Sequence, residues 1–277
     1  MSAHSERVID PAITDHYETG RERSRLFQGG RPALEFVRSL ELLDRLLPDP
    51  PARLLDVGGG PGTYAAPLAK GGYQVHLLDP VPLHVAQARE TAGSDPAVAF
   101  TAAIGDARDL PFTGESQDAV LLLGPLYHLT GPADRQQALA EARRVLRPGG
   151  RVLAAAISRF ASLLDGLYDG WLGDPELAAM VDRALADGQH RNRDPVGQPG
   201  FFTTAYFHTP DGLAAELAEA GFAGPVVYGV EGPGWPLEQE WADPRRREQI
   251  LFTARRAETE PSLIGFSHHF IAAGTKQ

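Results

Sequence analysis

The sequence predicts an α/β protein built on a doubly wound, mainly parallel sheet of seven strands. Three observations lead to this fold class. Short apolar segments alternate with helical ones, several are apolar at nearly every position, as in "DAVLLL" (Asp118–Leu123), and a turn with four glycines follows the first of them. Strands that are apolar on both faces are typical of parallel sheets covered by helices on both sides.

Taken in order, the elements divide the chain into four parts. Two helices are expected over residues 12–28 and 33–47, the second ending before Pro48. Strands with helices between them follow over Arg53–Val57, Tyr73–Leu78, Val98–Thr101, Asp118–Leu123 and Arg151–Ile157. The alternation stops over 158–209 and resumes with helices at 210–220 and 244–256 and strands at Val226–Val230 and His268–Ala273. We therefore expect an N-terminal helical lid (1–49), a core (50–157), an inserted helical cap (158–209) and a completion of the core sheet (210–277).

Composition narrows the possible partners. The chain has 277 residues, of which 26 are Lys or Arg and 36 are Asp or Glu, for a formal net charge of −10. Such acidity disfavours binding to nucleic acid through its phosphates. The absence of cysteine excludes disulfides and thiolate metal sites, and no grouping of Asp and Glu predicts another metal site. No apolar run is long enough for a membrane span or a signal peptide, so we expect a cytoplasmic protein; the sequence does not indicate an oligomeric state.

The glycine turn, "LLDVGGGPGT", has the spacing D-x-G-x-G-x-G from Asp56 to Gly62. In a doubly wound sheet the turn after the first strand lies where ligands bind, and glycine lets a ligand approach the backbone. A dinucleotide fingerprint, G-x-G-x-x-G, would place its third glycine at Thr63, one position later. This spacing counts against an NAD(P)-dependent oxidoreductase.

Two aspartates follow the next two strands. Asp79 comes 17 residues after Gly62 and is a candidate acceptor for both hydroxyls of a ribose, or else a cap for the next helix. Asp106, in "GDARDLPF", is a candidate acceptor for an exocyclic amine such as that of adenine, or else forms an Asx turn.

Together, "LLDVGGGPGTYAAPLA", "HLLDP", "GDARDLPF", "DAVLLLGPLYHL" and "LRPGG" resemble the motifs of the Rossmann-like class I S-adenosylmethionine-dependent methyltransferases. The resemblance covers residues 50–157 well and 210–277 more loosely. It implies S-adenosyl-L-methionine as the cofactor. Asp56 would then orient its amino group, Asp79 its ribose and Asp106 its adenine. The residues that the resemblance places around the cofactor are Asp56, Gly58, Gly60, Gly62, Asp79, Pro80, Val81, Asp106, Ala107 and Gly124.

The N-terminal helices offer further candidates for the cofactor site. Tyr17, Arg21 and Arg25 follow one another at i+4 spacing and share a helix face, which in relatives often belongs to a lid over the cofactor. Tyr17 and Arg25 are therefore candidate contacts, with the arginine meeting the cofactor carboxylate. Arg38, in the next helix, is a second candidate for that carboxylate.

The best candidate for a general base is His128 in "GPLYHL", just beyond the fourth strand, although it could instead pack the pocket wall. The aromatic stretch "FFTTAYFHTP" adds Tyr206 and His208 as further candidate catalytic residues in a pocket wall, or else it seats the cap on the core. His268 and His269 would lie on opposite faces of the last strand, so one of them is a candidate for the pocket.

The favoured function is methyl transfer to a small-molecule acceptor. Two alternatives stay open: a non-catalytic S-adenosylmethionine-binding protein, and, with less support, an NAD(P)-dependent oxidoreductase. The sequence does not show whether the acceptor atom is oxygen, nitrogen, carbon or sulfur.

Overall fold

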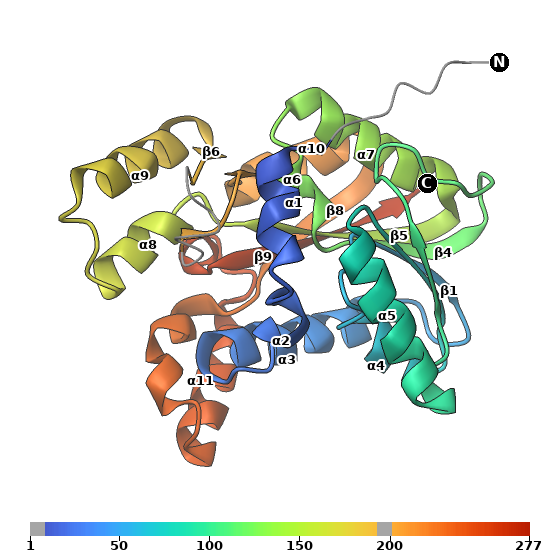
Figure 1. The fold of residues 1–277 in the computed structure, drawn as a ribbon, viewed down its shortest axis with the longest axis horizontal. Helices are drawn as coiled ribbons and strands as arrows, with labels where there is room; N and C mark the ends of the chain where they lie inside the picture. The colour runs from blue at the N-terminus through green and yellow to red at the C-terminus, as the bar shows by residue number, and fades with distance from the viewer. Residues whose placement is uncertain (1–8, 193–200) are drawn as a thin grey trace.

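The computed structural model describes residues 9–192 and 201–277, and its centre is a seven-stranded sheet in the order β3-β2-β1-β4-β5-β9-β8 (Figure 1). The first five strands pair in parallel, whereas β9 runs antiparallel to both β5 and β8. The strands are β1 (Arg53–Val57), β2 (Gln74–Asp79), β3 (Thr101–Ile104), β4 (Gln117–Leu122), β5 (Leu146–Ile157), β8 (Phe222–Gly229) and β9 (His269–Lys276). The mainly parallel, doubly wound sheet predicted from the sequence is confirmed.

Helices cover both faces of this sheet (Figure 1). On one face α7 (Pro132–Val145) and α10 (Pro210–Glu219) pack through leucines and alanines against one set of strand side chains. On the other face lie α3 (Gly30–Leu46), α4 (Ala65–Lys70) and α5 (Pro82–Ser94). Successive residues of β1 divide between the two apolar clusters, as strand alternation requires: Leu55 belongs to the first and Leu54 to the second. The last helix, α11 (Pro244–Ala257), packs against the 3₁₀ segment Gly232–Glu240.

Several predicted elements have other bounds in the structure: β5 begins five residues and β8 four residues earlier than expected. Two further differences have clear local reasons. The third strand begins at Thr101, three residues later than expected, because Pro96–Val98 forms a 3₁₀ turn that the Asp95 carboxylate caps. The first predicted helix is interrupted at Gly20, where φ is +72°. It therefore forms two short helices, α1 (Pro11–Glu18) and α2 (Glu22–Arg25).

The segment after β5 leaves the sheet and returns to it at the same strand end. The His208 backbone N–H donates to the Ile157 carbonyl oxygen at 2.8 Å. Between these points lie α8 (Ala161–Tyr168), α9 (Pro175–Asp187) and a two-stranded ribbon of β6 (Gln189–His190) and β7 (Ala205–Tyr206). In Figure 1, α8 and α9 lie on one side of α1 and α5 lies on the other.

A side-chain hydrogen bond joins the first helix to this segment, because the Thr203 hydroxyl donates to the Ala12 carbonyl oxygen at 2.9 Å. Within the described residues, no helix combines the length and apolar character that crossing a bilayer requires.

Candidate functional site

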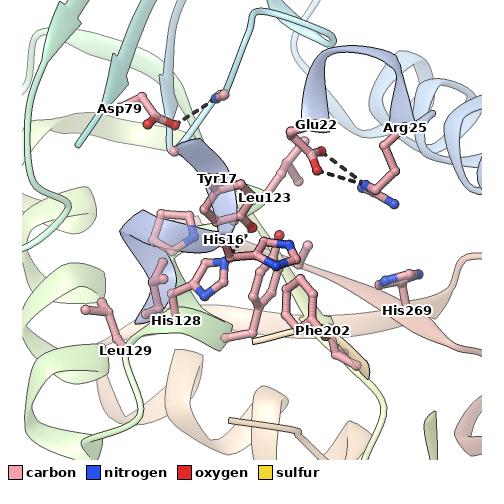
Figure 2. A pocket seen from close by; sticks show the side chains of 18 of the residues that line it. His16, Tyr17, Glu22, Arg25, Asp79, Leu123, His128, Leu129, Phe202 and His269 are labelled. Carbon is pink, nitrogen blue, oxygen red and sulfur yellow. Dashed lines mark hydrogen bonds and ion pairs between the residues drawn. The ribbon is translucent and has the colours of Figure 1, made fainter. Parts of the chain in front are cut away.

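A cavity of about 760 Å³ lies at the carboxyl ends of the parallel strands (Figure 2). The glycine turn, the ends of β2 and β4, helices α1 and α2, and residues of α8, α9 and the following ribbon line it. Its size is in the upper part of the range of small-ligand pockets, about 300–1,000 Å³. Ligands of doubly wound folds bind at this strand edge.

The glycine turn forms one wall of the cavity. Gly58 and Gly60 have φ of +71° and +57°, a region that favours glycine. A Cβ at Gly58 would lie 2.8 Å from Pro125. One at Gly60 would meet no atom of the described residues closer than His84 Nδ1 at 4.0 Å, so these residues leave the Gly60 backbone open to a ligand. Gly62 corrects the sequence prediction: it does not line the cavity, and its missing side chain makes room for the Phe100 ring, 2.7 Å from a Cβ.

Asp79 ties the glycine turn to the end of β2. One carboxylate oxygen accepts from the Gly60 backbone N–H at 2.9 Å, which Figure 2 shows, and the other accepts from Val81 N–H at 2.9 Å. The next helix has Val81 as its N-cap and no side-chain capping bond, so Asp79 is not a helix cap. Its carboxylate is buried at the edge of the cavity with a fixed orientation.

Asp56 is the most unusual group in the site. It is fully buried and lines the cavity, and neither carboxylate oxygen has a hydrogen-bond partner within the described residues. Burial, and secondarily the charge of Asp79, raises the pKa of Asp56 to about 7. A buried carboxylate without a partner is costly, so a cationic or hydrogen-bond-donating group of a ligand would stabilise the ionised form of Asp56.

His84, in the first turn of α5, lines the cavity but was not singled out from the sequence. Its Nδ1 lies 3.2 Å from Asp79 and therefore carries the proton that the carboxylate accepts. Its buried Nε2 has no partner within residues 9–192 and 201–277. Its place five residues after Asp79 was the signal that could have identified it, since the first turn of α5 starts at the same strand end.

The other predicted cofactor contacts in the core all line the cavity: Pro80, Asp106, Ala107 and Gly124. Asp106 accepts from the Arg108 backbone N–H at 2.8 Å and pairs with the Arg108 guanidinium at 2.6 Å. Asp106 thus forms the Asx turn that the sequence offered as an alternative to binding adenine, and it also borders the cavity. A Cβ at Gly124 would lie 3.1 Å from the Gly58 carbonyl oxygen, so glycine allows the β4 loop to lie close against the glycine turn.

Two of the three candidates from the N-terminal helices, Tyr17 and Arg25, line the cavity. The Tyr17 ring stands edge-on to His84, with centroids 4.9 Å apart. Arg25 is already paired with Glu22 at 3.1 Å, which Figure 2 shows, and with Glu35 at 2.7 Å.

Arg38 does not reach the cavity, which corrects its prediction as a cofactor contact. Its side chain is 1% exposed, donates to the Val230 carbonyl oxygen and pairs with Glu258 at 2.5 Å. The buried carboxylate of Glu258 holds the guanidinium on the far side of α3, away from the ligand space.

His128 lies in the cavity wall and is held on both ring nitrogens. Nε2 is 2.7 Å from the Tyr17 hydroxyl and Nδ1 is 3.4 Å from the Thr204 carbonyl oxygen. Burial lowers the pKa of His128 to about 4, so the ring is neutral at neutral pH. The rings of Tyr127 and Phe202 lie 4.7 and 5.5 Å from it, centroid to centroid.

Tyr206 and His208 do not line the cavity, which corrects the prediction for the aromatic stretch. The Tyr206 ring packs on the Arg135 guanidinium at 3.7 Å, and His208 Nε2 lies 3.2 Å from Glu216 on α10. Phe207, between them, points the other way, as neighbours in an extended segment do. The stretch instead supplies Phe201, Phe202 and Phe207 to the cavity.

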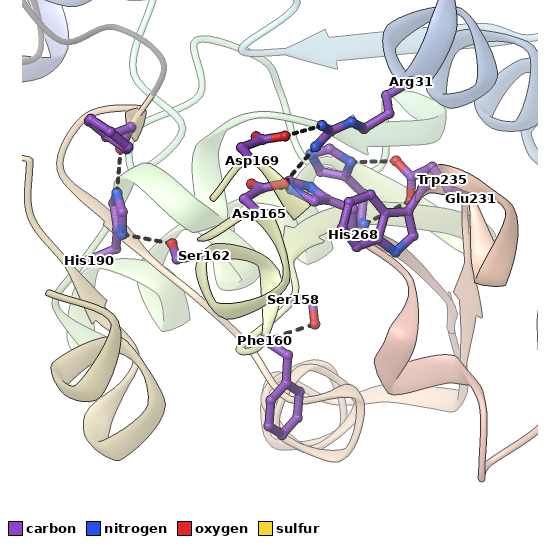
Figure 3. A network of polar contacts seen from close by, with 12 residues as sticks. Arg31, Ser158, Phe160, Ser162, Asp165, Asp169, His190, Glu231, Trp235 and His268 are labelled. Carbon is purple, nitrogen blue, oxygen red and sulfur yellow. Dashed lines mark hydrogen bonds and ion pairs between the residues drawn. The ribbon is translucent and has the colours of Figure 1, made fainter. Parts of the chain in front are cut away.

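His268 and His269 both line the cavity, although opposite orientations were expected. The strand β9 begins only at His269, so strand alternation does not apply to His268. In Figure 3, His268 reaches Asp165 on α8, at 2.9 Å, and Arg31 pairs with Asp165 and Asp169 at 2.7 and 2.9 Å. These contacts hold α8 against the N-terminal helices and the last strand.

His269 lies between two carboxylates. Its Nδ1 is 2.5 Å from Glu231 and 3.9 Å from Glu35. Burial lowers its pKa, but Glu35 and Glu231 outweigh burial and raise the pKa of His269 to about 9. Ligand atoms of these three residues lie within 4.8 Å of one another, as in a metal site. A protonated imidazole offers no lone pair to a metal, however, so the arrangement at neutral pH is an ion-pair network.

Comparison with known proteins agrees with this site. A family model described as "Methyltransferase domain" matches residues 55–154. The chain is 34% identical over 185 residues, 60% of its length and 70% of the relative's, to a Bordetella avium protein named ubiquinone/menaquinone biosynthesis C-methyltransferase UbiE. The protein belongs to the class I S-adenosylmethionine-dependent methyltransferase superfamily. S-adenosylmethionine is the cofactor of this superfamily.

Two further similarities concern the length and the fold of this chain. An uncharacterized 37.1 kDa protein in transposon Tn4556 of Streptomyces fradiae is 32% identical over 262 residues, 93% of this chain but 65% of that protein. An uncharacterized methyltransferase of Mycobacterium tuberculosis is likewise matched over 65% of its length, so the chain spans just under two thirds of these relatives. A Thermotoga maritima structure described as a possible histamine N-methyltransferase has the same fold, with a TM-score of 0.59, 21% identity, and coverage of 96% of this chain and 98% of that one.

The cavity contains buried polar atoms that fit the cofactor. Asp56 leaves two buried oxygens without partners, and His84 leaves one nitrogen. Both side chains lie at the wall formed by the glycine turn and the end of β2. S-adenosylmethionine carries an ammonium group and ribose hydroxyls, which can donate hydrogen bonds to such acceptors.

Proposed function

We propose that the protein transfers a methyl group from S-adenosylmethionine to a small-molecule acceptor. The observation that carries this proposal is the continuity of the cavity, which extends from the glycine turn to the space between α1 and α8. A cofactor at the glycine turn would leave the second part for an acceptor. In this proposal residues 1–49 act as the lid, 158–209 as the cap, and 50–157 with 210–277 as the core; residues 1–8 and 193–200 lie outside the described residues.

The second part of the cavity, which we call the acceptor compartment, has a continuous apolar and aromatic wall. This wall includes Ile157, Ala161, Trp171, Met180, Phe201, Phe202 and Phe207, and Ser162, Asp165 and His190 add polar groups to the lining. Such walls suit a compact, largely apolar ligand and exclude water from the reacting groups. A nucleic acid or a folded protein would have to present one small group through the lid and cap, so a free small molecule fits better.

The bound cofactor supplies a methyl group already activated by a positively charged sulfur. The protein's own residues then bind and orient. We propose that the Asp56 carboxylate receives the cofactor's ammonium group and that Asp79, with His84 beside it, receives the ribose hydroxyls. Asp106 and Ala107 border the adenine, and Arg25 of the lid faces the carboxylate. Placing an acceptor against the methyl group accounts for much of the rate, since orientation alone contributes several kcal/mol.

The names of two similar proteins support a small acceptor. One is named for a C-methyltransferase of ubiquinone and menaquinone biosynthesis and the other is described as a possible histamine N-methyltransferase. Both names refer to small molecules, but to different acceptor atoms. The acceptor atom of this protein is therefore argued from its own side chains below.

Two measurements test the proposed function. Calorimetry should show binding of S-adenosylmethionine and S-adenosylhomocysteine and no measurable binding of NAD. Incubation of a bacterial extract with the protein and methyl-labelled cofactor should then place label in the small-molecule fraction. Label only in protein or nucleic acid would refute the small-molecule acceptor, and binding without transfer to any fraction would support a non-catalytic binding protein.

A further inference from the structure

We propose that Tyr17 and His128 form a proton path for methyl transfer to an aromatic hydroxyl, in which Tyr17 touches the acceptor and His128 is the positioning residue behind it. This inference rests on the proposed function and specifies its acceptor. It differs from a direct role of His128 as the base.

The two side chains come from distant segments and meet in the cavity wall. The Tyr17 hydroxyl and His128 Nε2 are 2.7 Å apart, although the residues lie 111 positions apart in the chain. Tyr17 is on α1, and His128 ends the short helix α6 (Pro125–His128) that follows β4. Figure 2 shows Tyr17 above His128, with Phe202 and His16 beside them. The pair thus borders both the proposed cofactor wall and the acceptor compartment.

The hydrogen bonds determine the direction of the path. His128 Nδ1 faces the Thr204 carbonyl oxygen at 3.4 Å, and a carbonyl only accepts, so Nδ1 carries the proton. Nε2 then has a lone pair, and the Tyr17 hydroxyl donates to it. Because Tyr17 occupies Nε2, an acceptor cannot reach His128 directly. The Tyr17 oxygen keeps its own lone pairs, which can accept a proton from a ligand.

The reaction balances in atoms and charge. The acceptor oxygen bonds to the methyl carbon as the carbon–sulfur bond breaks. Its proton passes to the Tyr17 oxygen while the Tyr17 proton passes to His128 Nε2. The positive charge would leave the cofactor sulfur as the imidazole gains one, so the net charge of the reacting groups does not change.

The surroundings of His128 suit this exchange. The titratable groups that face it are Tyr17 and His16 from α1, Tyr127 from α6, His84 from α5 and Asp79 from β2. Burial keeps the imidazole neutral, which avoids a second cation beside a cationic cofactor. Because the reaction would remove the positive charge of the sulfur, the repulsion between the two cations would be absent when His128 receives its proton.

The acceptor compartment points to an aromatic hydroxyl. Trp171, Phe201 and Phe207 line it with flat apolar surface, and Met180 adds a deformable side chain. Burial raises the pKa of Tyr17 well above that of an ordinary phenol, so Tyr17 does not ionise on its own. It takes the proton of the acceptor hydroxyl only as it passes its own proton to His128 Nε2, 2.7 Å away. Aliphatic alcohols are far weaker acids and have no aromatic surface for these walls.

The first test follows the His128 ring by NMR and requires no acceptor. In the S-adenosylhomocysteine complex, Tyr17→Phe should raise the pKa of His128, because the hydroxyl stabilises the neutral ring, and the wild-type Nδ1–H tautomer should be visible in the nitrogen shifts. In the wild type, replacing S-adenosylhomocysteine by a cofactor analogue with an amine at the sulfur position should lower that pKa. Tyr168→Phe, which changes an exposed tyrosine on α8 outside the cavity, is the control. An unchanged pKa in Tyr17→Phe would overturn the path, while calorimetry reports separately on cofactor binding.

The second test uses a series of substituted phenols as methyl acceptors. Tyr17→Phe and His128→Asn should each lower kcat by about 10²–10⁴, and the double variant should be no slower than the slower single one, since both act in one path. The losses should shrink for 4-nitrophenol, which ionises without help near neutral pH. Three results would each overturn the proposal. The first is a loss of kcat in the double variant that equals the product of the two single losses, and the second is a Tyr17→Phe variant as fast as wild type. The third is a wild type that methylates other small molecules but no phenol.

Discussion

The two parts of the cavity are built in different ways. The cofactor wall consists of backbone and short side chains at adjacent strand ends, such as Gly60 and Asp79, which lie within 20 residues of one another and are hydrogen-bonded at 2.9 Å. The acceptor compartment is assembled from separate segments, with Tyr17 reaching His128 and Thr203 reaching Ala12 across the fold. The first depends on the sheet, whereas the second depends on how a lid and a cap close over it. Substitutions should therefore separate cofactor affinity from acceptor selection.

The largest expected effect is at the glycine turn. Gly58→Val should weaken cofactor binding by at least about 100-fold, because a side chain at φ +71° is strained and would overlap Pro125. Gly149→Val is the matched control, since Gly149 has φ +77° but no neighbour within 4 Å of a Cβ. Calorimetry on both variants separates backbone strain from loss of the site. Normal affinity in Gly58→Val would contradict the role of the turn.

Removing His269 should affect stability rather than cofactor binding. Its folded-state pKa of about 9 exceeds the ordinary 6.5, so its contribution is complete below pH 6.5 and is lost as the pH rises through 9. His269→Asn should therefore lower the free energy of unfolding by roughly 3 kcal/mol at pH 6 and by little at pH 10. Denaturant titrations at both pH values measure this, with His76→Asn, near the surface beside Thr101, as the control. A cost that does not depend on pH would exclude the ion-pair network.

Asp79→Ala should weaken cofactor binding by about 1.5–3 kcal/mol, the range for hydrogen bonds to a charged group. The variant also loses the bonds that hold Gly60 and Val81. Asp95→Ala removes an exposed aspartate that only caps a 3₁₀ turn and should leave the affinity unchanged. If Asp79→Ala lowered only the unfolding free energy, Asp79 would be structural and its assignment to the ribose would fail.

The pH dependence of cofactor binding should report on Asp56. Its pKa is about 7 in the free protein, and pairing with the cofactor's ammonium group lowers it in the complex. Affinity should therefore rise about tenfold from pH 6 to pH 8 and level off above that, because binding to the protonated form releases a proton. Calorimetry in buffers of different ionisation enthalpy measures how many protons are released on cofactor binding. Asp56→Asn should remove the dependence, and a dependence that persists would assign it to another group.

The smallest effect is expected in the acceptor compartment. Phe202→Ala removes a ring that lies 5.5 Å from both His16 and His128, centroid to centroid, and should raise the acceptor KM by about 5- to 10-fold, or about 1 kcal/mol. The cofactor dissociation constant should not change. Phe160→Ala, at an exposed position outside the cavity, is the control. Equal loss of cofactor and acceptor binding would show that the two parts of the cavity are not separable.

The sequence predicted the features that local chemistry determines. The alternation of apolar strands and helices predicted the sheet, and the resemblance of the glycine turn and the segments after it predicted the family that comparison with known proteins confirmed. Arg25 and Arg38 show where such reasoning ends. Both lie on N-terminal helices, but only contacts with Glu35 and with Glu258, 220 positions from Arg38, decide which one reaches the cavity. Tyr206, Phe207 and His208 show the same limit, because residue type does not reveal which side of an extended segment faces the ligand.

The hydrogen bond between Thr203 and the Ala12 carbonyl oxygen has a consequence for the order of catalytic events. It joins the proposed cap, which lies over the acceptor compartment, to the proposed lid over the cofactor. If the cap opens to release the methylated product, the lid over S-adenosylhomocysteine should therefore loosen as well. We expect the two departures to be kinetically linked and slow. In Thr203→Val the residence times of both products should shorten together, which stopped-flow release measurements would detect, while lifetimes that change independently would show that each cover opens by itself.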